Sequence, residues 1–252
     1  MNLISIRDLS IEDINNIVYG HIGWEDRAIP QVGILFLEPS TRTKYSFISA
    51  INLLGWRYID FANETMSTKK GESIEDTLRM CLAYVDILVI RSSSKILVYK
   101  AVEISKKEFS NEKIIINGGN GINEHPTQAI LDYKIMLEHC PDPSMIKPKF
   151  FYKAPYRAVN SLQYLLEMVN GYNKNDVMTT EEINFIYVGR GYTGLIDNNI
   201  LHKYPNAYIM HPLPRNEELS KELDGNERSI YFSQAENGPF VRASLMRYLM
   251  NN

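Results

Sequence analysis

The sequence lacks the features that mark several large classes of protein. It has only two cysteines among 252 residues, Cys81 and Cys140. Neither has a Cys or His companion at metal-ligand spacing, so neither a disulfide framework nor a zinc site is predicted. No run of about eighteen apolar residues occurs, so no membrane-spanning helix is expected. The start, MNLISIRDLSIED, lacks the basic residues and apolar core of a signal peptide, which favours a cytoplasmic location.

An excess of charge of one sign is also missing. The 27 Lys and Arg residues face 30 Asp and Glu residues, and the formal net charge is -3. Because no basic field is available to attract a phosphate backbone, nucleic acid is not an expected partner. What the chain does have is a hydrophobic composition of 44%, enough to bury the core of one large domain or of two smaller ones.

Strand and helix patterns alternate through the first half of the chain. Short apolar runs of strand length are followed by segments in which apolar residues recur at helical spacing. The predicted strands are 32–37, 58–61, 85–90 and 113–116, and the predicted helices are 11–18, 45–54, 73–83 and 127–137. This alternation predicts a parallel sheet with helices on both faces.

The second half begins after a proline-rich segment. PDPSMIKP, residues 141–148, holds three prolines and ends the preceding helical pattern. Beyond it the sequence predicts a second, short α/β unit, with strands at 149–152, 184–188 and 207–210 and a helix at 158–169. The amphipathic segment 241–250 is expected to be a helix that packs back on the first domain.

The motif EPSTRT, residues 38–43, lies where a predicted strand passes into a helix. Ligands of open α/β sheets bind at the carboxyl ends of strands, and the free N–H groups and dipole of a helix N-terminus suit an anion. Ser40, Thr41 and Thr43 add hydroxyl donors, and Arg42 adds a planar fork that matches a phosphate. Taken alone, the motif is explained equally well as an ordinary helix N-cap.

Two further polar clusters follow predicted strands. HPTQ places His125 and Gln128 after the glycine-rich NGGNG, and the two side chains, one helical turn apart, can reach a single carbonyl-bearing ligand. A helix start with Pro126 at its first position is the simpler interpretation of this motif alone. Arg91 ends the apolar run VDILVIR, at the mouth of the predicted sheet. Three anion-suited clusters at three strand ends indicate a binding site more specifically than any one of them.

Six segments resemble, in the same order, the aspartate transcarbamoylase branch of the aspartate/ornithine carbamoyltransferase family. They are EPSTRT (38–43), KKGES-EDT (69–77), YVDILVIR (84–91), HPTQAILD (125–132), HPLPR (211–215) and YFSQAENGPFVR (231–242). The resemblance is close at both ends of the chain and looser between them. The QAENG segment and the absence of a cysteine-containing segment like FLNCLP resemble the aspartate branch rather than the ornithine branch.

The resemblance implies a fold and a division into domains. It implies an α/β fold of two doubly wound parallel-sheet domains, the second of them reduced. Residues 1–135 and 237–252 form the implied carbamoyl-phosphate-binding domain, and residues 136–236 form a truncated amine-acceptor domain. On either side of Arg190 the chain is shorter than the family pattern by enough residues for about two strand–helix units.

The resemblance also implies roles for residues on the carbamoyl phosphate side. The implied phosphate cradle consists of Ser40, Thr41, Arg42 and Thr43. Arg91, His125 and Gln128 match the residues that hold the carbamoyl group. Lys70 matches a lysine that enters the active site of a neighbouring subunit, which implies a homotrimer. Leu213 and Pro214 match a segment whose backbone contacts the carbamoyl amide and the acceptor.

On the acceptor side the resemblance implies two arginines. Arg157 in YRAVNSL matches a clamp for an acceptor carboxylate, which Glu38 would orient, and Arg190 in FIYVGRGY is the candidate for the side-chain carboxylate of aspartate. The sequence departs from the family here, because Tyr192 stands where the family has glutamine and Leu195 stands where it has a further arginine.

The implied activity is carbamoyl transfer from carbamoyl phosphate to the amino group of an amino acid, with L-aspartate as the first candidate. The implied reaction uses no metal, cofactor or covalent intermediate. Two alternatives stay open. One is a carbamoyltransferase that acts on a different amine, and the other is a catalytically silent homologue that serves as a binding subunit of a larger carbamoyltransferase. The presence of Arg42, Arg91 and His125 together argues against a silent chain.

Overall fold

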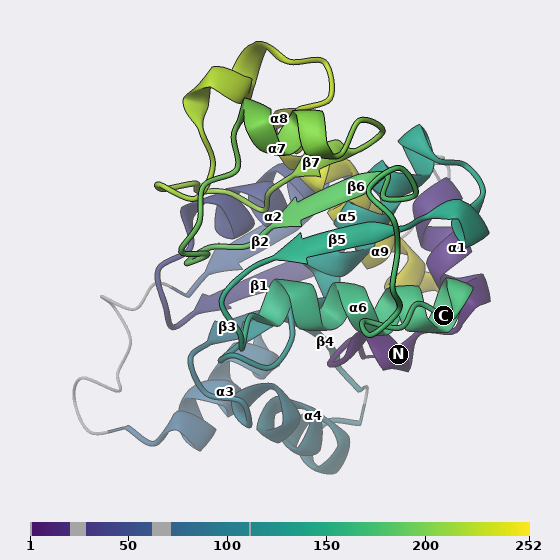
Figure 1. The fold of residues 1–252 in the computed structure, drawn as a ribbon. Coiled ribbons are helices and arrows are strands. Elements are labelled where there is room, and N and C mark those ends of the chain that lie inside the picture. The colour runs from purple at the N-terminus through teal and green to yellow at the C-terminus, as the bar shows by residue number, and fades with distance from the viewer. Residues whose placement is uncertain (1, 21–28, 62–71, 111) are drawn as a thin grey trace. The chain divides into compact units, whose positions relative to one another are not determined.

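The computed structural model describes residues 2–20, 29–61, 72–110 and 112–252. The chain divides into two compact units: unit 1 is Met1–Thr127 with Pro239–Asn252, and unit 2 is Gln128–Gly238. The corresponding boundaries expected from the sequence are 135/136 and 236/237. Each unit contains its own parallel sheet (Figure 1), which confirms the predicted α/β class with two parallel-sheet domains.

Unit 1 is built on a four-stranded sheet. Its described strands are β1 (Gln31–Phe36), β2 (Arg57–Asp60), β3 (Ile87–Ser92) and β4 (Ile114–Asn120). Its described helices are η1 (Ile6–Asp8), α1 (Ile11–Tyr19), α2 (Thr41–Leu53), α3 (Ile74–Ala83), α4 (Leu97–Glu108) and α9 (Gly238–Asn251). The strands are all parallel, in the order β2-β1-β3-β4. The predicted strands of this region are therefore present, with ends shifted by a few residues.

Burial on both faces explains why β1 and β3 have nearly continuous apolar sequences. Ile34 and Leu35 are adjacent in β1 and point to opposite faces, yet both are fully buried. Helices α3 and α4 cover one face and lie side by side in Figure 1. Their shared core with the sheet includes Leu35, Leu78, Leu82, Leu88, Ile90, Val98, Ala101 and Ile115.

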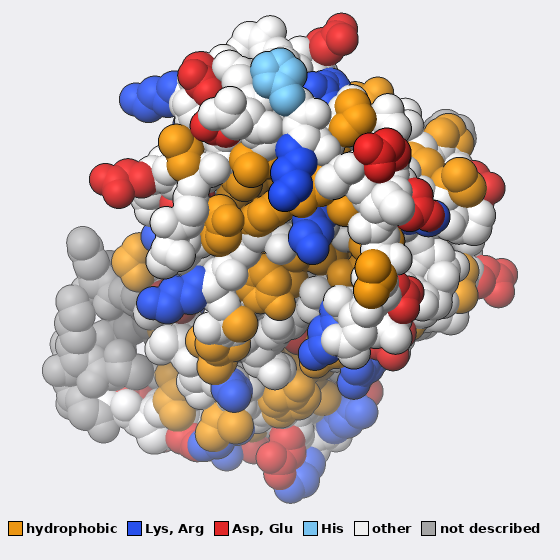
Figure 2. Space-filling model, in the orientation of Figure 1, with side chains coloured by type: hydrophobic (Ala, Val, Ile, Leu, Met, Phe, Trp, Pro, Cys, Tyr) orange, Lys and Arg blue, Asp and Glu red, His pale blue; other side chains and the backbone are white. Residues whose placement is uncertain are grey.

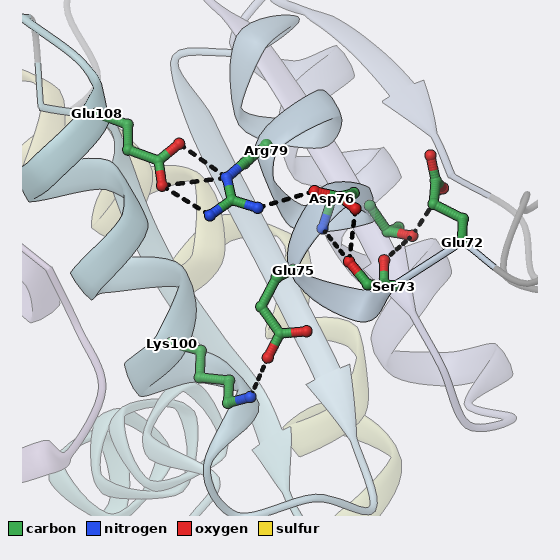
Figure 3. A network of polar contacts seen from close by, with 8 residues as sticks. Glu72, Ser73, Glu75, Asp76, Arg79, Lys100 and Glu108 are labelled. Atoms are coloured by element: carbon green, nitrogen blue, oxygen red, sulfur yellow. Dashed lines mark hydrogen bonds and ion pairs between the residues drawn. The ribbon is translucent and has the colours of Figure 1, made fainter.

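Helix α4 is an element that the sequence patterns above do not predict. Its buried residues Leu97, Val98, Ala101 and Ile104 nevertheless recur at helical spacing. Figure 3 shows that charged side chains join α4 to α3: Arg79 pairs with Glu108 at 2.8 Å across the two helices. Because these side chains are exposed, such pairs contribute little to stability, and the apolar core between the helices holds them together.

The C-terminal helix α9 returns to unit 1. The Arg242 guanidinium donates to the Ser46 hydroxyl at 2.8 Å and lies 5.2 Å from the centre of the Phe47 ring. The Ser244 hydroxyl donates to the backbone oxygen of Ile17, and the Tyr248 hydroxyl donates to Asp13. Helix α9 therefore packs against both α1 and α2.

Unit 2, which is described throughout, has a smaller sheet of three parallel strands in the order β5-β6-β7. The strands are β5 (Pro148–Phe151), β6 (Phe185–Val188) and β7 (Tyr208–Met210). The helices are α5 (Pro126–His139), which begins at the end of unit 1, α6 (Arg157–Asn170), α7 (Asn198–Lys203), α8 (Tyr231–Glu236) and the short η3 (Pro143–Met145) and η4 (Lys221–Gly225). The second parallel-sheet domain is thus present and small, as the sequence predicts.

The described surface carries no marked charge segregation on the face drawn in Figure 2. There, basic and acidic side chains both occur among hydrophobic and uncharged ones. None of the described helices is long and apolar enough to cross a membrane.

Candidate functional site

The strand order of unit 1 creates a natural ligand site. From β1 the chain passes to β2 on one side and afterwards to β3 on the other, so the order reverses between β1 and β3. Open α/β sheets bind ligands at the carboxyl ends of the strands that flank such a reversal. Phe36 at the end of β1 pairs with Arg91 near the end of β3, and the backbone N–H of Leu37 donates to the Arg91 oxygen at 2.8 Å.

The N-terminus of α2 follows β1 at this reversal and is not capped by its own side chain. Ser40 occupies the N-cap position, but its side chain makes no capping hydrogen bond. By contrast, the hydroxyls of Ser10 and Ser73 accept hydrogen bonds from the first turns of α1 and α3. The ordinary N-cap interpretation of EPSTRT is therefore not what the structure shows. The first-turn N–H groups of α2, with the positive end of the helix dipole, suit an anion.

Arg91 is the centre of the polar cluster at this edge. Its side chain is 12% exposed, and its Nε lies 2.8 Å from Oε1 of Glu38 in an ion pair. Its Nη1 donates to the backbone oxygen of Gly118 at 3.0 Å and to the Thr43 hydroxyl at 3.5 Å. The guanidinium of Arg91, a residue of β3, therefore links Glu38, which follows β1, with residues of α2 and β4, and its planar fork is fixed from two sides.

His125 completes the cluster. Its Nε2 lies 3.3 Å from Nη1 of Arg91, and its Nδ1 lies 3.5 Å from the Thr127 hydroxyl. Because arginine can only donate, Nε2 must accept, and the proton of the neutral imidazole then belongs on Nδ1. The structure thus brings Thr43, Arg91 and His125 together, as three neighbouring strand ends predict.

The other predicted residues of the phosphate side differ in exposure. Ser40 is partly buried, whereas Thr41 and Arg42 are exposed at the start of α2. Arg42 has no ion-pair or hydrogen-bond partner within the part of unit 1 that is described. Its guanidinium is therefore available to an anion there. Lys70 lies outside the described residues.

In unit 2, Gln128 and the segment after β7 carry the remaining candidates for the carbamoyl group. Gln128 is 8% exposed, and its Nε2 donates to Oδ1 of Asp132 at 2.8 Å. Leu213 has a φ of 48° and is the one non-glycine residue with positive φ in the described chain, and Pro214 follows it. Such backbone strain in a residue with a branched side chain is typical of functional segments.

His211 holds the Leu213–Pro214 segment in place. It is fully buried, the Leu213 backbone N–H donates to its Nδ1 at 2.8 Å, and its Nε2 lies 3.0 Å from Oε1 of Glu218. Nδ1 therefore accepts, and Nε2 carries the proton that is donated to Glu218. Burial lowers the pKa of His211 to about 4, although the Glu218 carboxylate acts in the opposite direction.

The two predicted acceptor arginines follow neighbouring strands of unit 2. Arg157 is the first residue of α6, after β5, and Arg190 follows β6. Both charges act on the same Tyr156 hydroxyl: burial raises the pKa of Tyr156, while a hydrogen bond from the Arg190 backbone and the two guanidinium charges oppose that rise. Arg190 is exposed, and Arg157 is partly buried with partners of its own.

The two departures from the family pattern near Arg190 are visible in the structure. The Tyr192 ring packs edge-on against Phe151, with ring centroids 5.4 Å apart, and Leu195 is 51% exposed. Neither position offers a cationic group to a carboxylate.

Sequence reasoning missed the buried polar residues behind these candidates. Asp132 and Gln234 are fully buried, and Glu218 is 3% exposed. The available signal is an acidic residue four positions after Gln128, directly behind the apolar run Ala129–Leu131, since i and i+4 side chains meet. Among the residues that the structure describes, no group of three or more His, Cys, Asp or Glu could hold a metal ion.

Comparison with known proteins identifies the family. Residues 1–138 match the model of the carbamoyl-phosphate-binding domain of aspartate/ornithine carbamoyltransferases, and residues 181–249 match the model of their Asp/Orn-binding domain. The chain belongs to the aspartate/ornithine carbamoyltransferase family. This membership confirms the resemblance drawn from the six sequence segments.

Individual members of the carbamoyltransferase family are similar over nearly the whole chain. The aspartate carbamoyltransferase catalytic subunit of Wigglesworthia glossinidia brevipalpis is 30% identical, covering 99% of this chain and 96% of that protein. The multifunctional protein URA2 of Saccharomyces cerevisiae is 31% identical over 95% of this chain, which spans only 12% of the yeast protein. A solved aspartate transcarbamoylase from Trypanosoma cruzi, in complex with carbamoyl phosphate and aspartate, has a TM-score of 0.85 at 25% identity, covering 97% of this chain and 95% of that one.

This carbamoyltransferase chain is shorter than its relative from Wigglesworthia. The match to the Wigglesworthia protein runs over 303 positions, whereas this chain has 252 residues. The relative therefore carries segments that have no counterpart here. Residues 139–180, which include β5 and α6, lie outside both family-model matches.

Proposed function

We propose that this chain transfers the carbamoyl group of carbamoyl phosphate to the amino group of L-aspartate, giving N-carbamoyl-aspartate and phosphate, in the cytoplasm. The observation that carries the proposal is the cluster of Thr43, Arg91 and His125, held by Glu38 at the reversal of the first sheet beside an uncapped helix N-terminus. Membership of the family supplies the reaction class.

On the donor side, the proposed phosphate site is the start of α2. Ser40, Thr41 and Thr43 supply hydroxyls there, and Arg42 supplies a guanidinium with no partner among the described residues. Helix N–H groups and arginine are complementary to phosphate oxygens. The proposed partner of the carbamoyl oxygen is Arg91 with the Thr43 hydroxyl. His125 then acts by holding Arg91, because its Nε2 accepts from that guanidinium.

On the acceptor side, Arg157 and Arg190 are proposed to bind the carboxylates of aspartate. Both guanidinium charges act to lower the pKa of the same Tyr156 hydroxyl. The backbone of Leu213 and Pro214 is proposed to contact the carbamoyl amide. The acceptor nitrogen attacks the carbamoyl carbon, the C–O bond to phosphate breaks, and the departing phosphate takes up the proton that the amine loses. Positioning and electrostatic stabilisation of the developing negative charges then provide the catalysis.

The test of the proposed function is a panel of amine acceptors assayed with carbamoyl phosphate. We expect L-aspartate to give the largest kcat/KM, because two arginines are available for its two carboxylates. A second candidate function is carbamoyl transfer to a different amine. It is favoured by Tyr192, which packs on Phe151, and by Leu195, because the family pattern has a glutamine and an arginine at these positions. A larger kcat/KM with another amine would select that candidate. Absence of product with every amine would contradict carbamoyl transfer and favour a silent binding subunit.

We also propose a homotrimer in which Lys70 enters the site of the neighbouring subunit. Arg42→Ala chains and Lys70→Ala chains, each inactive alone, are then mixed in equal proportions. About a quarter of the sites should be active, because each site takes residue 42 from one chain and residue 70 from its neighbour independently. Activity is measured after subunit exchange. The control is each variant exchanged with itself. Mixed trimers without recovered activity would show that each site uses Lys70 of its own chain or none.

A further inference from the structure

A buried carboxylate in unit 2 receives hydrogen bonds from three side chains. Asp132, in α5, is fully buried. Its Oδ1 accepts from Nε2 of Gln128 at 2.8 Å and from Nε2 of Gln234 at 2.6 Å, and its Oδ2 accepts from the Tyr187 hydroxyl at 2.7 Å. Burying a carboxylate is costly unless donors surround it, and here three side-chain donors do so.

A backbone group determines the orientation of the two amides. The His211 backbone N–H, which can only donate, lies 2.9 Å from Oε1 of Gln234. The oxygen of Gln234 must therefore face His211, and its NH2 group must face Asp132. Oδ1 of Asp132 is consequently an acceptor, and it accepts the NH2 group of Gln128 as well. The backbone N–H of His211 thus orients Gln234, Gln234 donates to Asp132, and Asp132 in turn orients the amide of Gln128.

One N–H of Gln128 holds the NH2 end of its amide against Asp132, and the carbonyl oxygen at the other end is the acceptor left for a ligand. No described residue donates to that Oε1. We infer that Asp132 is a positioning and specificity-determining residue, which makes Gln128 present a hydrogen-bond acceptor and so selects a carbamoyl NH2 over a methyl group. This inference rests on the proposed function, in which Gln128 meets the carbamoyl group.

The energetic basis is the cost of an unpaired polar group. A ligand with a methyl group in place of NH2 leaves Oε1 of Gln128 desolvated without a partner, and sites built to hydrogen-bond a ligand reject analogues that lack the donor. If the amide could rotate freely, it would present either end, and much of this selectivity would disappear. Asp132 prevents the rotation because an ionised carboxylate cannot donate to the carbonyl end.

Three ligands separate the parts of the site: inorganic phosphate occupies only the phosphate cradle, acetyl phosphate adds a carbonyl, and carbamoyl phosphate adds the NH2 group. Their Kd values are measured by calorimetry. In Asp132→Leu we expect the ratio of the acetyl phosphate Kd to the carbamoyl phosphate Kd to fall about tenfold, corresponding to one hydrogen bond. The Kd of inorganic phosphate should change less than about twofold. A purely structural role would weaken all three ligands together.

Asp132→Asn is the matched variant. Its Oδ1 still accepts from both glutamines, while its NH2 group can donate to the Tyr187 oxygen, so the ratio should stay close to the wild-type value. In a Gln128→Met background, where the amide is absent, Asp132→Leu should no longer change the ratio. The inference would be overturned by an unchanged Kd ratio in Asp132→Leu or by an equally large fall of the ratio in Asp132→Asn. It would also be overturned if Asp132→Leu still changed the ratio in the Gln128→Met background.

A measurement on the wild-type chain serves if Asp132→Leu does not fold. With 15N-labelled glutamine, the side-chain NH2 signals of Gln128, assigned by their absence in Gln128→Met, should keep their positions when carbamoyl phosphate replaces inorganic phosphate. Large shifts of these NH2 signals would show that the NH2 end faces the ligand and would refute the inference. If wild-type chain binds carbamoyl phosphate no better than inorganic phosphate, the proposed function fails instead, which the same titrations reveal.

Discussion

Replacing Arg91 by lysine is expected to lower kcat/KM for carbamoyl phosphate by roughly 100- to 1,000-fold, the usual effect of losing one donor to a developing oxyanion. The Arg91 fork pairs with Glu38 through Nε while its Nη1 contacts Gly118, Thr43 and His125. A lysine ammonium is a single point charge on a flexible chain and cannot make these contacts from two sides at once. Steady-state kinetics at saturating acceptor measure the loss.

The matched control is Arg79→Lys, which makes the same chemical change at an exposed arginine of α3. Arg79 pairs with Asp76 and Glu108 on the surface (Figure 3), away from the strand ends that carry the candidate site. Its activity should equal that of the wild type. Thermal unfolding of both variants separates loss of function from loss of fold. A folded Arg91→Lys enzyme within about fivefold of wild-type kcat/KM would remove Arg91 from the proposed oxyanion contact.

The sequence predicts unit 1 well because local pattern and tertiary environment agree there. Strands such as β3, predicted at 85–90 and found at Ile87–Ser92, are buried on both faces, so their apolar runs are long. The polar residues at the ends of these runs mark the carboxyl ends of the strands. From parallel strands alone it follows that Thr43, Arg91 and His125 share one edge. Helix α4 goes unpredicted even though Leu97, Val98, Ala101 and Ile104 have helical spacing, because its first residues also read as a short apolar strand.

The polar interior of unit 2 could not be predicted in the same way. Gln234 donates a hydrogen bond to Asp132, which lies 102 positions away in the sequence, and no local sequence pattern predicts such a pair. His211 and Glu218 sit in loop segments, where their burial depends on β7 and α8 rather than on periodicity. Recognition of HPLPR points to Leu213 and Pro214, but the side chains that hold them emerge only from the fold.

Acidification from pH 6.5 to 4 is expected to cost the folded chain roughly 3 kcal/mol through His211 alone. Burial lowers the pKa of this imidazole to about 4, whereas Glu218 raises it and Arg215 and Arg190 lower it further. Because the folded-state pKa lies below the ordinary value, the unfolded chain binds the proton first as pH falls. The stabilisation is therefore complete above pH about 6.5 and is lost as pH approaches 4.

Urea unfolding across this pH range measures the effect, with His211→Asn as the test variant. The Asn side chain retains an acceptor for the Leu213 N–H but has no proton to gain, so its free energy of unfolding should fall less steeply between pH 6.5 and 4.5. Glu218 titrates only at lower pH: burial raises the pKa of its carboxyl, but hydrogen bonds with the backbone of Asn216, with its own backbone and with His211 together lower that pKa. His202→Asn is the control, because that imidazole is exposed. Equal slopes in wild type and His211→Asn would contradict a neutral buried His211.

Protonation of His211 also affects the segment that it holds. A protonated Nδ1 would oppose the Leu213 N–H, so the strained Leu213–Pro214 segment should lose its anchor in the same pH range.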